Sequence, residues 1–132
     1  MIVVDASALV AIGDLEPEAS AFLAALARAE RALISPINAA ETGLVLIGRG
    51  RLESIDHLSD WIAGMAIEVS NQPMSHHEAL TAYLRYGKGY HPARLNLGDC
   101  FAYALARLLD APLLYKGDDF AQTDIRSAFQ PT

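Results

Sequence analysis

The chain opens with Met1-Ile-Val-Val-Asp5-Ala-Ser7-Ala-Leu9, an apolar run broken by a single carboxylate. Residues 2–4 are too apolar for a surface strand, so they predict a short buried strand that ends at Asp5. Residues 6–12 then have the pattern of a short helix. Burying an isolated carboxylate is costly. Asp5 therefore needs a partner, a proton or a metal ion.

Further acidic residues stand at comparable places, inside apolar helices or where a strand gives way to a turn or a helix. They are Glu41 in Asn-Ala-Ala-Glu-Thr, Asp99 in Asn-Leu-Gly-Asp-Cys, and the pair Asp118 and Asp119 in Lys-Gly-Asp-Asp-Phe. Oxygen ligands with few nitrogen or sulfur ligands favour a hard cation such as Mg²⁺ or Mn²⁺. The sequence thus predicts a carboxylate-held metal site if these positions meet in space.

The rest of the chain predicts an alternation of short strands and helices. Apolar runs predict strands at 32–34, 66–69 and 112–115, and a short last strand that includes Ile125. Helical spacing predicts helices over 18–31, from 36 to 48–50, and over 55–66 and 76–86, with a last one from 98 or 99 to 109. Residues 87–97 are predicted to be a loop, because their Gly and Pro residues disfavour regular structure.

Such an alternation predicts an α/β fold with a mostly parallel sheet of four to five short strands covered by helices on both faces. In such sheets, ligands bind at the carboxyl ends of the strands. Asp5 follows the first strand, and Asp118 and Asp119 follow the strand at 112–115. Asp99 would open a helix, and Glu41 would point from the side of another. One pocket can collect all of them.

Length and composition limit the classes of protein. A chain of 132 residues with 52% hydrophobic content predicts one globular domain spanning 1–132. Its apolar runs are too short for a membrane helix and its start lacks a signal peptide, so we expect a cytoplasmic protein without membrane contact. The single Cys100 excludes an internal disulfide and a Cys-based zinc cage, and the histidines have no metal-binding spacing.

The net charge of −6 argues against nucleic-acid binding, since phosphate contacts need Lys and Arg. Divalent metal ions can supply that charge locally, so a nuclease is not excluded. The segment 85–94, Arg-Tyr-Gly-Lys-Gly-Tyr-His-Pro-Ala-Arg, is the only basic, aromatic and flexible stretch. Lys88 and Arg94 are candidates for holding phosphates, and the tyrosines for stacking on bases. A solvated loop, or a site covered by a partner protein, is the alternative.

Four stretches in register resemble the PIN-domain ribonucleases, most closely the VapC toxins of type II (VapBC) toxin–antitoxin pairs. They are Val3-Val-Asp-Ala-Ser-Ala-Leu, Ala39-Ala-Glu-Thr, Leu95-Asn-Leu-Gly-Asp-Cys-Phe-Ala-Tyr-Ala and Leu113-Leu-Tyr-Lys-Gly-Asp-Asp-Phe-Ala-Gln-Thr-Asp-Ile. The resemblance covers the chain from end to end. It implies a PIN-like three-layer sandwich.

The resemblance also implies an Mg²⁺-dependent endoribonuclease toxin, with Mn²⁺ able to substitute. Its acidic residues map onto Asp5, Glu41, Asp99 and Asp119, and Asp118 remains a possible alternative to Asp119. The hydroxyl after the first aspartate corresponds to Ser7, a candidate for bonding a ligand carboxylate or a phosphate. A VapB-type antitoxin and a homodimer are the implied partners, and RNA is the implied substrate.

Three other functions have weaker support in the sequence. A DNA nuclease of related fold would need DNA-clamping segments, which a chain this small lacks. A non-catalytic PIN-like module need not keep the acid set, which is complete here. A phosphate-accepting receiver domain would need paired acids after the first strand, and Asp5-Ala6 does not supply them.

Overall fold

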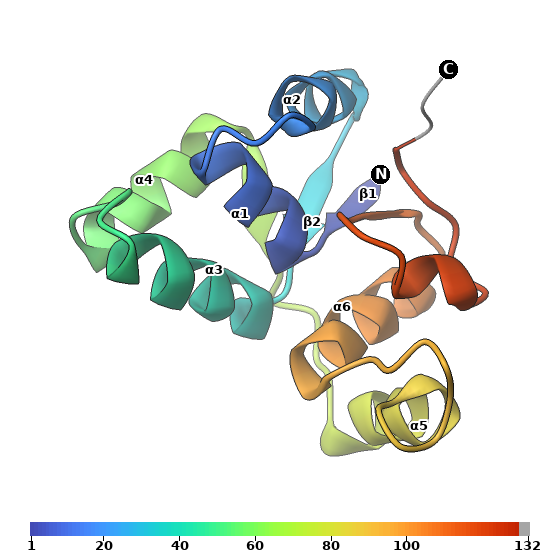
Figure 1. Ribbon diagram of the computed structural model, residues 1–132. Helices are drawn as coiled ribbons and strands as arrows, with labels where there is room; N and C mark the ends of the chain where they lie inside the picture. The colour runs from blue at the N-terminus through green and yellow to red at the C-terminus, as the bar shows by residue number, and fades with distance from the viewer. Residues whose placement is uncertain (130–132) are drawn as a thin grey trace.

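A computed structural model describes residues 1–129. Its centre is a four-stranded sheet in the order β3-β2-β1-β4, with every pair parallel (Figure 1). The strands are β1 Ile2–Val4, β2 Ala32–Ile34, β3 Ile67–Val69 and β4 Leu113–Leu114. The predicted parallel sheet is confirmed. Its central strands are apolar throughout because helices cover both of their faces.

Six α-helices and one short 3-10 helix surround the sheet within residues 1–129. They are α1 Ala6–Gly13, α2 Ala19–Arg28, α3 Pro36–Gly48, α4 Ile55–Gly64, α5 His76–Tyr86, α6 Leu97–Leu108 and η1 Phe120–Gln122. None of the described helices is long and apolar enough to cross a membrane. The cytoplasmic location stays a prediction.

The helix starts follow their capping residues. Ser35 accepts a hydrogen bond from the backbone N–H of Asn38, and Pro36 occupies the first turn of α3. Ser75 and Glu78 form a reciprocal capping box at the start of α5. Several element ends differ from prediction by one to three residues. Helix α2 stops at Arg28, and Ala66 adopts a positive φ of 58° that places it between α4 and β3.

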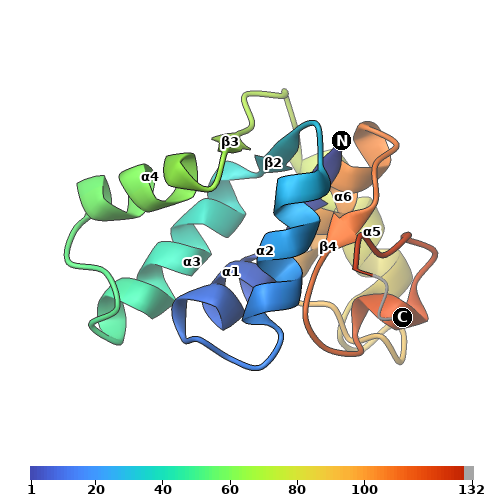
Figure 2. The same ribbon diagram turned by 90° about the horizontal axis from the view of Figure 1, so that it is seen from above.

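The helices form outer layers on the two faces of the sheet, as the two views in Figures 1 and 2 show. The molecule has two hydrophobic cores, one on each face of the sheet, and alternate residues of β1 point into them. Ile2 and Val4 pack with α1 to α4, and Val3 packs with α5 and α6. The three-layer sandwich implied by the resemblance is confirmed. Within it, β1 is central, so the residue after its last position lies in the middle of the sheet's carboxyl edge.

The predicted last strand is wrong in detail. Only Ser127 pairs with the sheet, through an isolated parallel bridge to Leu113, and Ile125 lies outside it. The backbone N–H of Leu113 donates to Arg126 at 2.8 Å, and that of Ala128 donates to Leu113 at 2.9 Å. This bridge anchors the segment that follows η1 against β4.

Candidate active site

A cavity of about 470 Å³ opens at the carboxyl edge of the sheet. Asp5 follows strand β1 there, the loop after β4 passes there, and the side of α3 and the start of α6 contribute lining residues. Its lining residues are Asp5, Ala6, Ser7, Val10, Glu16, Glu41, Val45, Arg49, Asn96, Asp99, Lys116 and Gly117. Three of the predicted acids, Asp5, Glu41 and Asp99, therefore share one cavity.

Asp5 has two oxygens in different situations. Oδ2 accepts a hydrogen bond of 3.0 Å from the backbone N–H of Ser7 and so caps helix α1. Oδ1 is buried and has no hydrogen-bond partner, in a side chain that is only 3% exposed. A buried oxygen without a partner is rare and costly. This oxygen is free to take a ligand from the cavity.

Glu41 is held in place by a buried amide. The side-chain N–H groups of Asn38 donate to Oε1 of Glu41 at 2.7 Å and to the carbonyl of Gly98 at 2.9 Å. The carbonyl oxygen of that amide accepts from the Ser35 hydroxyl. Asn38 is fully buried, so it joins α3 to the start of α6 through bonds that are shielded from water.

Asp99 is fixed by a reciprocal pair of bonds at the start of α6. Its backbone N–H donates to Oδ1 of Asn96 at 2.8 Å, and its Oδ2 accepts from the backbone N–H of Asn96 at 3.0 Å. This capping box positions the carboxylate beside the helix N-terminus, where the helix dipole favours negative charge. Cys100, the next residue, is fully buried, and burial raises the pKa of its thiol to about 12. It is a core residue.

Asp5 and Asp99 have raised pKa values, chiefly because they are buried. Burial raises the pKa of Asp5 to about 6, against opposing hydrogen bonds from Ser7 and with a smaller contribution from Glu41. Burial also raises the pKa of Asp99 to about 7, and the charges of Asp5, Glu41 and Asp119 add to the effect. These carboxylates are therefore electrostatically coupled and hold protons more tightly than isolated aspartates.

The two aspartates of the last turn face different surroundings. Asp119 precedes η1 and is close enough to Asp99 to influence its pKa, although it does not line the acid cavity. Asp118 lines a neighbouring cavity instead. Neither aspartate lines the acid cavity, and the choice of Asp119 over Asp118 stays a prediction.

The auxiliary residues divide between two places. Ser7 lies in the acid cavity, where its Oγ accepts a 3.0 Å hydrogen bond from the backbone N–H of Lys116. Lys88 and Arg94 line a separate surface hollow of about 570 Å³ in the loop between α5 and α6. The structure does not bring Lys88 or Arg94 into the acid cavity.

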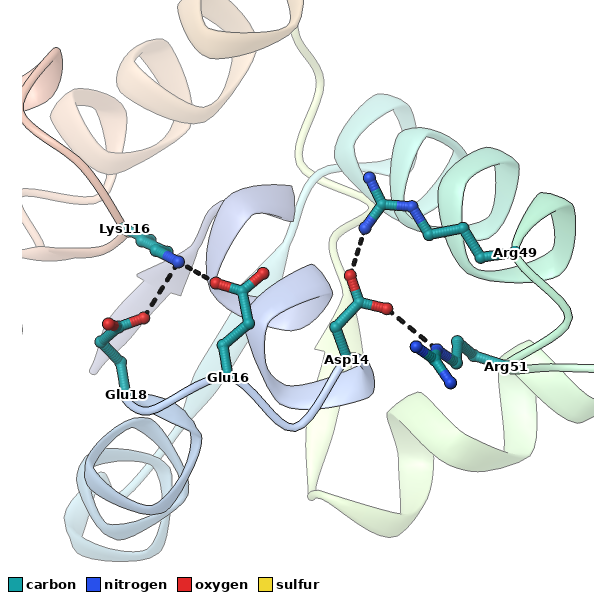
Figure 3. A network of polar contacts seen from close by, with 6 residues as sticks. All are labelled: Asp14, Glu16, Glu18, Arg49, Arg51 and Lys116. Carbon is teal, nitrogen blue, oxygen red and sulfur yellow. Dashed lines mark hydrogen bonds and ion pairs between the residues drawn. The ribbon is translucent and has the colours of Figure 1, made fainter.

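Basic residues at the rim of the acid cavity are paired with acids (Figure 3). The ammonium of Lys116 pairs with Glu16 and, at 3.1 Å, with Glu18. Asp14 pairs with Arg49 and, at 3.1 Å, with Arg51. These pairs join the turn between α1 and α2 to the loop after β4 and to the end of α3. They partly neutralise the rim around an acidic interior.

Sequence reasoning missed Asn96, Arg49 and Lys116, which line the cavity, and the buried Asn38, which holds Glu41. A usable signal existed for the two asparagines. Each stands three residues before an acid, in Asn38-x-x-Glu41 and Asn96-x-x-Asp99, a spacing that brings side chains together at a helix start. The two basic residues had no such signal, because their partners are distant in sequence.

The cavity offers a divalent ion only a few carboxylate oxygens. The described residues contain no group of three or more His, Cys, Asp or Glu side chains arranged to hold a metal ion. Mg²⁺ commonly binds through one or two carboxylates and keeps several waters. The unpartnered oxygen of Asp5, with Asp99 in the same cavity, fits that mode.

The model of the PIN domain family matches residues 2–126. The chain belongs to the PIN-domain family. Within that family, it is similar to ribonuclease VapC30 of Mycobacterium tuberculosis, with 41% identity over 98% of this chain and 99% of VapC30. It is also 42% identical to ribonuclease VapC42 of the same species, over 96% of this chain and 98% of VapC42. These similarities place the PIN domain described here among the VapC ribonucleases.

A solved structure has the same fold. It is the crystal structure of Mycobacterium tuberculosis VapC20, described as a toxin that cleaves the sarcin-ricin loop. The TM-score is 0.76 at 15% identity, covering 98% of this chain and 100% of VapC20. At this identity the likeness concerns the fold alone.

Proposed function

We propose that this chain is the toxin of a type II toxin–antitoxin module and that it hydrolyses RNA phosphodiester bonds internally. The observation that carries the proposal is the unpartnered buried oxygen of Asp5 in a cavity shared with Glu41 and Asp99. Membership of the VapC ribonucleases supports the same reaction. The family match over residues 2–126 also supports a single PIN domain for residues 1–132.

The acids are assigned roles from their surroundings. VapC ribonucleases of the PIN family generally depend on a divalent metal, and we propose Mg²⁺, with Mn²⁺ as a substitute. Asp5 and Asp99 would bind the ion directly, and Glu41 and Asp119 would bind it through water or orient the attacking water. When bound, the ion would make a water more nucleophilic and offset charge on the phosphate.

The protein's own contribution is positional. The Ser7 N–H, the Asn38 amide and the Asn96 backbone each hold one carboxylate in a fixed direction. Fixed carboxylates save the reorganisation that a flexible site would need in the transition state. The Ser7 hydroxyl, which already accepts from Lys116, keeps its own proton for a carboxylate or a phosphate oxygen.

RNA contact outside the acid cavity is assigned to the loop between α5 and α6. Its hollow is lined by Lys88, Gly89, Tyr90, His91, Pro92 and Arg94, which supply cations and an exposed aromatic ring. Tyr90 is 62% exposed, so its ring is available for stacking on a base. This arrangement supports binding of single-stranded RNA by a chain that is acidic overall.

Two protein partners are part of the proposal. A VapB-type antitoxin would inhibit the enzyme by placing a basic side chain in the acid cavity, where carboxylates attract an arginine. A second copy of the chain would complete a homodimer. Exposed apolar side chains such as Leu80 and Leu84, one turn apart on α5, support a protein contact of this kind.

Purified protein tests the reaction directly. Single-stranded RNA and DNA of the same sequence are incubated with wild type and with Asp99→Asn, with and without Mg²⁺. We expect cleavage of RNA by wild type with Mg²⁺ and none by Asp99→Asn, although both proteins melt cooperatively. Preferential DNA cleavage would favour a DNA nuclease, and no cleavage of either would favour a non-catalytic PIN-like module.

A further inference from the structure

A second cavity of about 460 Å³ adjoins the acid cavity. The two share Lys116 and Gly117, which form the ridge between them. The positive φ of 97° at Gly117 turns the chain there, so that Tyr115 and Asp118 line the second cavity, on the far side of the ridge from Asp5. A strand of RNA that places a phosphate at the acids would cross this ridge with the neighbouring nucleotide.

The walls of the second cavity include two supported aromatic rings. Phe129 packs edge-on against the buried ring of Phe22, with centroids 5.2 Å apart. Tyr115 packs against Phe120 at 5.1 Å. Phe129 and Tyr115 both remain partly exposed in the cavity, so their positions are set by packing while part of each surface stays open. Rigid aromatic surfaces of this kind are suited to nucleobases.

Two carboxylates line this cavity, together with the Lys116 ammonium and the Ser127 hydroxyl. Asp118 is exposed at its edge, and Oε2 of Glu18 is buried there without a hydrogen-bond partner. That oxygen is 3.1 Å from the Lys116 ammonium, so it has charge compensation without an aligned hydrogen bond. Carboxylates repel phosphate but accept bonds from the N–H groups of bases. The cavity therefore suits a base, and the ridge suits a phosphate.

We propose that this cavity is a nucleobase subsite for the nucleotide next to the scissile phosphodiester. The proposal rests on the RNA cleavage proposed above and adds its base preference. Lys116 contacts the backbone phosphate at the ridge, Tyr115 and Phe129 contact the base, and Asp118 reads the base edge. Guanine is the preferred base, because its adjacent N1–H and N2–H groups match a carboxylate with two bonds.

Binding tests this subsite without cleavage. Fluorescein-labelled 2′-O-methyl trinucleotides that differ only in one terminal base are titrated into Asp99→Asn protein, and polarisation gives the dissociation constants. We expect the guanine trinucleotide to bind about tenfold more tightly than the uracil one, within the range of a bidentate base contact. Equal binding of all four bases would overturn the proposal.

Two variants in the same background separate the roles of the residues. Asp118→Asn should erase the guanine preference, whereas Lys116→Gln should weaken all four trinucleotides by a similar factor. Asp60→Asn, at an exposed position of α4, is the matched control for the loss of a carboxylate and should keep the preference. A guanine preference that survives Asp118→Asn would overturn the assignment of the base edge.

Sequencing of RNA ends separates this inference from the proposed function. Wild-type protein is given a randomised RNA pool, and the cut ends are sequenced. Cleavage beside guanine that becomes unselective in Asp118→Asn supports the subsite. Cleavage with no base preference beside the cut overturns the subsite and leaves the ribonuclease proposal intact, whereas a wild-type protein that cuts no RNA overturns the ribonuclease proposal itself.

Discussion

The missing side chain of Gly98 makes room for the carboxylate of Glu41. A Cβ built on Gly98 would lie 2.1 Å from Oε2 of Glu41, far inside van der Waals contact. Both residues accept hydrogen bonds from the side-chain amide of Asn38. The start of α6, at Gly98, therefore packs directly against the side of α3, at Glu41. The close approach sets where Glu41 lies relative to Asp99, the next residue along α6.

Gly98→Ala is expected to reduce RNA cleavage at least tenfold without loss of stability. The new methyl group would push aside the flexible end of Glu41, while alanine in place of glycine favours a helix by roughly 0.5–1 kcal/mol. Cleavage rate and thermal melting are the measurements. Gly48→Ala is the matched control, because a Cβ there meets nothing within 4 Å. Full activity in Gly98→Ala would show that the position of Glu41 is unimportant.

Asn38→Ala should lower both stability and turnover. The change leaves the Gly98 carbonyl and the Ser35 hydroxyl without their partner, at a cost of about 1–3 kcal/mol. It also releases Glu41, so kcat should fall more than KM rises. Thr42→Val is the control, since the Thr42 hydroxyl donates to the Asn38 backbone carbonyl at 2.8 Å rather than to Glu41. The stability of Thr42→Val should fall, while its kcat should remain near that of wild type.

Mg²⁺ should raise the melting temperature of wild-type protein, because a ligand that binds only the folded state stabilises it by mass action. The gain should be larger at pH 8 than at pH 5.5, where protons compete for the carboxylates. Asp5→Asn should abolish the gain and melt no lower than wild type without metal, because it removes a buried charge. A Mg²⁺ effect of wild-type size in Asp5→Asn would contradict the assigned ligand.

The metal-free protein should lose stability as the pH rises from 4 to 7. The pKa values of Asp5 and Asp99 are raised from 3.8 to about 6 and about 7. In this window the folded protein holds protons that the unfolded chain has released, so deprotonation favours unfolding. The loss should amount to roughly 1–3 kcal/mol and level off above about pH 8, because the pKa of Asp99 is about 7. Urea unfolding in a chelator measures it, and a slope unchanged in Asp99→Asn would argue against this cause.

Charge reversal at Lys88 and Arg94 should weaken RNA binding and reduce its salt dependence. Each lost phosphate contact lowers the slope of log K against log salt by about 0.7 for a single strand. Binding by Asp99→Asn protein is measured from 50 to 300 mM salt. Each residue is reversed singly, and Arg31→Glu, which makes the same change of charge at an exposed ion pair with Glu68, is the control. If Arg31→Glu acts like the loop reversals, the loop has no specific role.

The strands and helices were largely predictable from the sequence because their signals are local. Ser35 followed by Pro36 and Ser75 followed by Glu78 mark helix starts through bonds within four residues. The short apolar runs become strands because two helical layers cover them. The end of the chain was harder, since the bridge at Ser127 depends on Leu113, which the local pattern around Ile125 does not reveal.

The acids of the site were predictable as types and only partly as a geometry. The pattern identified Asp5, Glu41 and Asp99, which share the cavity. The hydrogen bonds that hold these carboxylates in place were not predictable, because Asn38 contacts Gly98 across sixty residues of sequence. The cationic rim also depends on distant pairs, such as Lys116 with Glu16. Such contacts follow from the packing of whole helices.

The strand order has a consequence for how the enzyme is made. Strand β4, the last along the chain, pairs with β1, the first, and the loop after it closes the cavity around Asp5. During synthesis on a ribosome, Asp5, Glu41 and Asp99 all emerge before the segment that completes their pocket. A polypeptide that stops short of β4 therefore lacks an assembled nuclease centre, and the hydrolytic machinery comes together only after Gly117 has been synthesised.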